Sequence, residues 1–219
     1  MERVESVERV TTGEAGPSRE RLGPPWWAVV SSALAPVSLS VGWVVAGAVQ
    51  PPEYSAVRHS LSALAGHGGA ERWIMTTSLF VLGACHVVTA LGLTSLRPSA
   101  RLVLGGAGVS GIALAAFPQP AGGSAAEHVA FVVVGSILIA AWPAFVGSCD
   151  RSDSFVLSVR GSAAATTVFV ALTVAFLISA QGGKWFGLME RIGLTPETLW
   201  PLVVVLALRH SARREAGAS

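Results

Sequence analysis

Long apolar stretches alternate with short polar connections from residue 26 to residue 208, and the stretches contain almost no Asp, Glu, Lys or Arg. A helix that rises ~1.5 Å per residue needs roughly 20 apolar residues to cross the ~30 Å hydrocarbon layer of a membrane. The pattern therefore predicts an all-α fold, a polytopic membrane helical bundle with six transmembrane helices. The predicted helices cover about residues 26–49, 73–96, 101–117, 128–147, 155–180 and 196–208.

The sixth predicted helix is the shortest. Thr195 as N-cap and Pro196 at the first helical position are typical of a helix start, yet the apolar run that follows is about half the length that a span requires. The third helix differs in another way, because small residues four apart, as in Ala107 and Gly111, allow two membrane helices to approach closely.

The basic residues predict the orientation. With the N-terminus in the cytoplasm, the outer segments hold only Arg58, Arg72, Lys184 and Arg191. The cytoplasmic segments then hold the other 11 of the 15 basic residues: Arg3, Arg9, Arg19, Arg21, Arg97, Arg101, Arg151, Arg160, Arg209, Arg213 and Arg214. Because positive charge in short loops stays inside, we expect a multi-pass protein of the cytoplasmic (inner) membrane with both termini inside.

The two ends of the chain are predicted to be cytoplasmic tails, a disordered one over residues 1–25 and a short one over residues 209–219. The alternative for the N-terminal part is a signal peptide cleaved after residues 46–48, but the apolar run is about twice the length of a normal signal core.

Composition narrows the classes of partner. Charged residues make up 13% of the chain and the net charge of +2 is too small to suggest a nucleic-acid partner, so none is expected. Membrane lipids are the expected surroundings, with a lipid or isoprenoid ligand or a partner membrane protein as further candidates. Cys85 and Cys149 are expected to be free thiols, and no metal or other cofactor is predicted.

The outer connections carry nearly all the groups capable of specific chemistry. Two short interfacial helices are predicted there, one from Ser55, as N-cap, through Ala65, and a second over residues 185–192. We expect a ligand site built from Tyr54, Arg58, His59, Ser62, Glu190 and Arg191.

Several chemistries remain open at the outer side. A catalytic set would comprise Glu71, Glu127 and His128. As a hydrolase, the protein would pair Ser60 or Ser62 with His128; as an acid-catalysed isoprenoid cyclase, it would protonate an alkene from an outer glutamate. Binding of a lipid, peptide or partner subunit at the cationic outer rim is physically simpler, and it is the function that we expect.

His86 is a polar residue predicted deep inside the membrane. An ionisable group at such a depth is a candidate functional residue. The structural alternative is a neutral imidazole that is hydrogen-bonded to a carbonyl of a neighbouring helix.

The order of several short motifs resembles the prokaryotic six-helix proteins filed as domain of unknown function 998, over about residues 30–208. The motifs are the run at 54–65, Gly92-Leu93, the glycine-rich stretch 105–118 ending in Phe-Pro, His128, and the run at 187–192. The resemblance implies six spans and an uncharacterised activity. In the last motif we expect Gln where this chain has Glu190.

Overall fold

A computed structural model describes residues 23–147 and 154–218, and seven α-helices form in these residues. Their bounds are α1 Trp26–Ala48, α2 Leu61–Ala65, α3 Trp73–Gly92, α4 Pro98–Ala116, α5 Ala126–Ala141, α6 Val159–Ser179 and α7 Phe186–Ala218. Two 3₁₀ helices, η1 Trp142–Phe145 and η2 Phe155–Leu157, continue α5 and precede α6.

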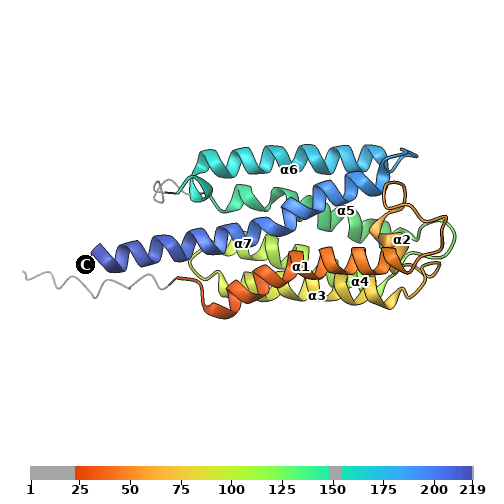
Figure 1. The fold of residues 1–219 in the computed structure, drawn as a ribbon. Helices are drawn as coiled ribbons and strands as arrows, with labels where there is room; N and C mark the ends of the chain where they lie inside the picture. Colours follow the sequence, from red (N-terminus) through yellow and green to blue (C-terminus); the bar gives the residue numbers. More distant parts are fainter. Residues whose placement is uncertain (1–22, 148–153, 219) are drawn as a thin grey trace, which may run out of the picture.

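The contacts between the six long helices join them in a closed ring in chain order, and Figure 1 shows the helices side by side along the length of the molecule. α1 packs on α3, α3 on α4, α4 on α5, α5 on α6 and α6 on α7, and α7 closes the ring against α1. The short α2 lies at one end of the ring, and α7 extends past the other helices at the opposite end (Figure 1). We call these the α2 end and the C-terminal end.

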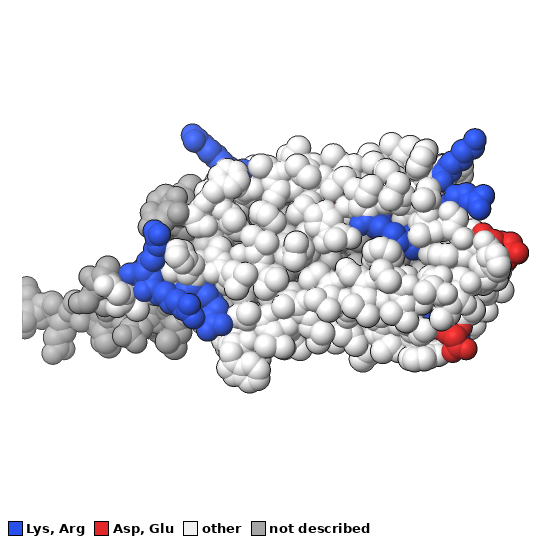
Figure 2. Space-filling model, viewed as in Figure 1, with Lys and Arg blue, Asp and Glu red and all other residues white. Residues whose placement is uncertain are grey.

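Six of the described helical segments are long and apolar enough to cross a membrane. On the face that Figure 2 shows, Lys, Arg, Asp and Glu lie mainly towards the two ends of the molecule, and the surface between them is uncharged except for one basic patch. The prediction of an all-α, six-span membrane bundle is confirmed.

The backbones of α3 and α4 approach each other closely. A Cβ added at Gly83 would lie 2.5 Å from the Gly108 carbonyl oxygen, and one added at Gly108 would lie 2.6 Å from that of Gly83. Close approach through small residues is therefore how α4 packs, as its glycine-rich sequence predicts.

The last helix differs from its predicted bounds. α7 begins at Phe186 rather than at Pro196 and is 33 residues long, so the predicted second interfacial helix at 185–192 is instead the first turns of α7. Thr195 is no N-cap: its hydroxyl donates a hydrogen bond to the Arg191 carbonyl within the helix (2.7 Å). The helix also continues through residues 209–218, so the predicted C-terminal tail is helical.

The prediction failed here because Glu190, Arg191 and Glu197 interrupt the apolar run and resemble a polar loop. In the fold all three side chains are buried (3–7% exposed).

The remaining sequence predictions on residues 1–22 and on Cys149 lie outside the described residues, whereas Cys85 is a buried free thiol.

Candidate functional site at the α2 end

The connection between α1 and α3 is folded onto the end of the bundle. The Gln50 side-chain amide closes this loop, because it donates to the Ala70 carbonyl (2.9 Å) and accepts from the Ala70 amide (3.1 Å). Further along, the amide of His67 donates to the Gln119 carbonyl (2.9 Å) and so ties this loop to the α4–α5 connection. Loops that are distant in sequence thus meet over the ring.

The helix predicted from Ser55 is shorter than expected. α2 begins at Leu61, and Ser60 is its N-cap, with the hydroxyl oxygen accepting from the Ala63 amide (3.1 Å). The physical reason lies in the preceding carbonyls. Those of Ala56 and His59 accept hydrogen bonds from Arg191, and that of Val57 accepts one from the Leu188 amide, so they bind α7 instead of a following helical turn.

Arg191 is the centre of this contact. Its guanidinium donates to the carbonyls of Ala56 (2.8 Å) and His59 (3.0 Å) and to the hydroxyl of Tyr54 (2.8 Å). It also lies over the Trp43 ring, 5.2 Å from the ring centroid, within the range of a cation–π interaction. Such bonds to a charged donor are roughly twice as strong as neutral ones, so Arg191 fastens the loop to α7.

The neighbouring side chains complete the contact. The carboxylate of Glu190 accepts from the Leu61 amide at 2.6 Å, and the ring of His59 stacks on that of Tyr54. Burial raises the pKa of Tyr54 above 10, against the opposing effect of the Arg191 guanidinium. The phenol therefore stays neutral and donates or accepts as a hydroxyl.

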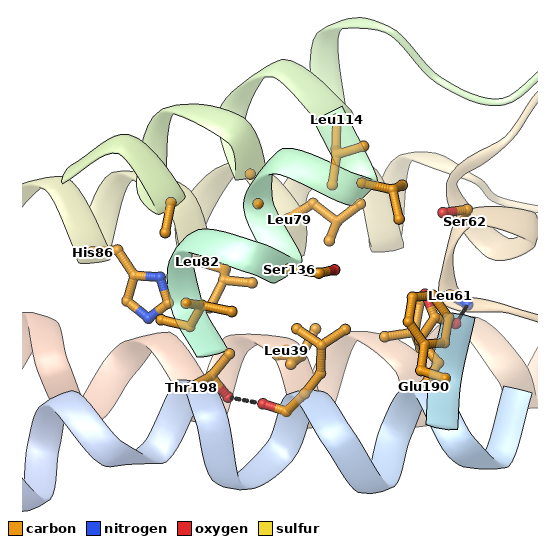
Figure 3. Close-up of a pocket in the computed structure, with 17 residues that line it drawn as sticks. Leu39, Leu61, Ser62, Leu79, Leu82, His86, Leu114, Ser136, Glu190 and Thr198 are labelled. Carbon is orange, nitrogen blue, oxygen red and sulfur yellow. Dashed lines mark hydrogen bonds between the residues drawn. The ribbon is translucent and has the colours of Figure 1, made fainter. Parts of the chain in front are cut away.

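An internal cavity of about 70 Å³ lies below this contact, inside the ring. This volume is the space open to the centres of water-sized molecules, so the void itself is wider on every side by about the radius of one water molecule. Most of its wall is apolar. Polar groups lie at its ends, with Glu190 and Ser62 at the α2 end and His86 and Thr198 deeper in the bundle, and Ser136 lies between them (Figure 3). The lining residues are Leu39, Leu61, Ser62, Leu79, Leu82, His86, Ala107, Gly111, Leu114, Val132, Gly135, Ser136, Ile139, Phe176, Glu190, Leu194 and Thr198.

The residues of the predicted ligand site therefore fall into two groups, those that hold the loop and those that line the cavity. Tyr54, His59 and Arg191 are brought together, but the described contacts use them to hold the loop. Glu190 and Ser62 line the cavity. Arg58 is exposed to solvent.

The predicted catalytic residues lie apart from the cavity wall. His128 is buried (4% exposed) at the start of α5, and its Nδ1 bonds to the Phe117 carbonyl (2.9 Å). Glu127 is exposed, and Glu71 is exposed with its carboxylate accepting from the Trp73 indole N–H (2.7 Å). Among the described residues no group of three or more His, Cys, Asp or Glu is placed to hold a metal ion.

Sequence reasoning missed Glu197 as a buried group. Its carboxylate lies between α6 and α7 and accepts a hydrogen bond from the Thr173 hydroxyl (2.9 Å). The available signal was spacing: Glu190 and Glu197 are seven residues apart, which places both on one face of a continuous helix.

Comparison with known proteins identifies one family. Residues 32–207 match the model of the family described as "Protein of unknown function (DUF998)". None of the curated proteins and none of the solved structures matches the chain.

Proposed function

Because this chain belongs to the DUF998 family of proteins of unknown function, its activity has to be argued from the structure, and we propose that it binds a slender, lipid-like amphiphile in the cavity of the helix ring. The apolar chain of the ligand lies among the leucine side chains, and its polar head lies beside Glu190 and Ser62. The observation that carries the proposal is a mostly apolar cavity that ends at a buried carboxylate under the α2 end.

The chemistry of the wall indicates the class of head group. Glu190 can accept a hydrogen bond from a hydroxyl or an amine, whereas a phosphate or carboxylate beside it would be repelled. Arg191 does not offset this, because its terminal nitrogens already bond to the loop and it is not among the cavity-lining residues. A neutral or cationic head is therefore favoured over an anionic one.

Photolabelling tests the proposal. The protein in lipid nanodiscs is irradiated with a long-chain alcohol that carries a diazirine, and labelled peptides are identified by mass spectrometry. Ser136, which points into the cavity (Figure 3), is changed to Phe to fill it. The matched control is Val134→Phe, on the exposed face of the same helix.

We expect wild type and Val134→Phe to be labelled on cavity-lining peptides and Ser136→Phe to lose this labelling. Equal labelling of all three proteins would show that the alcohol binds elsewhere, and the proposal would be wrong.

Acid-catalysed isoprenoid chemistry is the second candidate, favoured by the same buried Glu190. The wall offers little to stabilise a carbocation, since Phe176 is the one Phe, Tyr or Trp among the lining residues described. Binding is therefore the stronger proposal. Formation of a cyclised product from an unsaturated isoprenoid alcohol by wild type, and its loss in Glu190→Gln, would reverse this order.

We propose that the α2 end faces the outside of the inner membrane. In support, Arg97 lies in the α3–α4 connection at the C-terminal end, and Arg101 and Arg160 lie in the first turns of α4 and α6 at the same end. Short basic segments stay in the cytoplasm. The test is labelling of intact cells with a membrane-impermeant maleimide, in a background without the native cysteines. We expect Gly122→Cys to react and Thr94→Cys to react only after lysis; the reverse pattern would invert the orientation.

A further inference from the structure

His86 is a buried polar residue with one ring nitrogen that has no hydrogen-bond partner among the described residues. It lies on α3, is 3% exposed and lines the cavity. Its ring lies near the backbone of Thr198, yet Nε2 has no hydrogen-bond partner among the described residues. Nearly all buried polar atoms in proteins have a partner, so a group that enters the cavity is expected to supply one.

The position of His86 sets the distance between the two polar ends of the cavity that a bound molecule would have to span. Figure 3 shows the imidazole at one end of the cavity and Glu190 and Ser62 at the other; the side chains between them are mostly apolar, with Ser136 the labelled polar one. Along α7, the lining residues run from Glu190 to Thr198. The eight steps from Glu190 to Thr198 correspond to roughly 12 Å of helix.

We propose that His86 binds a second polar group at the far end of the ligand, so that the ligand is an elongated apolar molecule with a neutral hydrogen-bonding group at each end. This inference rests on the proposed function and names the class of ligand. A hydroxyl fits best, because it can both donate and accept and so matches either neutral tautomer of the imidazole.

A charged far end is disfavoured by the surroundings. None of the described residues that line the cavity is Lys or Arg, and an ionised group brought into an apolar wall without a partner is costly. A long-chain diol represents this class, and a mono-alcohol of the same chain length lacks only the group that His86 would bind.

The test compares decanediol, with one hydroxyl at each end, with decanol as competitors of the photoactivatable alcohol. The proteins are wild type, His86→Leu and His86→Gln, all in nanodiscs of the same lipid. The measured quantity is the ratio of the two competitors' apparent affinities. Comparing this ratio between proteins cancels the different partitioning of the two molecules into the lipid.

We expect the diol-to-alcohol affinity ratio to be about fivefold higher in wild type than in His86→Leu, as one net hydrogen bond gives. His86→Gln, which keeps a hydrogen-bonding side chain, should recover part of the difference. Decanol itself should compete equally well with all three proteins, which shows that the variants are folded and retain the site.

Two results would overturn the inference, and they are distinguishable. If decanol competes normally but the ratio is the same in all three proteins, His86 contacts a water molecule or nothing, and only the second polar group is refuted. If neither competitor displaces the probe from the cavity of wild type, the proposed function fails as well.

Discussion

Replacement of Gly187 by alanine should release the loop from α7. A Cβ at this position would lie 2.6 Å from the Ala56 carbonyl oxygen and closer still to that of His59. Both obstacles are backbone atoms, so no side-chain rotation can relieve the clash. Clearing the Ala56 oxygen to the 3.4 Å at which ordinary van der Waals contact begins needs a retreat of about 0.8 Å, and the nearer His59 oxygen requires the loop to move further than this.

The size of the effect follows from the bonds that this retreat lengthens. They are the Leu188–Val57 backbone bond (3.0 Å) and the bonds of Arg191 to Ala56 (2.8 Å) and His59 (3.0 Å). A neutral hydrogen bond contributes about 1 kcal/mol and each bond to a charged group about 1.5 kcal/mol or more. Alanine returns up to about 1 kcal/mol of helix propensity, so the docked loop loses about 3 kcal/mol.

Hydrogen exchange measures this loss directly. The Leu61 amide, which donates to Glu190, should exchange on the order of a hundredfold faster in Gly187→Ala, since 1.4 kcal/mol corresponds to a factor of ten. Gly193→Ala is the matched control on the same helix, because its nearest neighbour would be an ordinary 3.8 Å away. Equal exchange in the two variants would refute the reasoning.

Tyr54 offers a second readout of the same event. It is the one tyrosine in the chain, so ultraviolet titration reports on it alone. In wild type its pKa should lie above 10 because it is partly buried, and in Gly187→Ala the pKa should return towards 10 as the loop detaches and water reaches the phenol. An unchanged titration in the variant would contradict the detachment.

Two further predictions concern the interior of the bundle. Gly108→Ala should destabilise the protein by about 1–3 kcal/mol through overpacking against Gly83. In the control Gly105→Ala the new Cβ would lie 3.8 Å from its nearest neighbour, so the melting temperature in detergent should be unchanged or higher. Equal melting temperatures of the two variants would argue against the close contact. Glu197→Gln keeps an acceptor for the Thr173 hydroxyl and should melt close to wild type, whereas Glu197→Leu should lose about 1 kcal/mol. A large loss in the glutamine variant would show instead that the charge is required.

The number of spans could be predicted from the sequence, because the cost of placing charge in a membrane is a property of each local stretch. Trp26 and Trp73, the predicted first residues of two spans, are where α1 and α3 begin. The same local criterion failed for α7. It divided a continuous helix at Pro196 because it treated Glu190 and Glu197 as water-exposed.

Residue types indicated which part of the candidate site would be important, but not what each residue does. The pattern of the first loop and of residues 187–192 predicted that Tyr54, His59, Glu190 and Arg191 belong together. Only the tertiary structure shows that Arg191 donates hydrogen bonds to carbonyls of the loop, whereas Glu190 also lines the cavity.

The cavity itself was decided by the tertiary structure alone. Its wall takes residues from α1 through α7, and it exists because α7 closes the ring against α1. No periodicity within one helix encodes such a space, since its shape depends on how side chains from different helices fill the centre. The sequence by itself determined a six-span bundle with most of its charges at the ends, because the free-energy cost of placing a charged residue in the membrane depends on that residue and its local stretch. The placement of His86 and Glu190 at opposite ends of one apolar cavity depended on packing between segments that are distant in the chain.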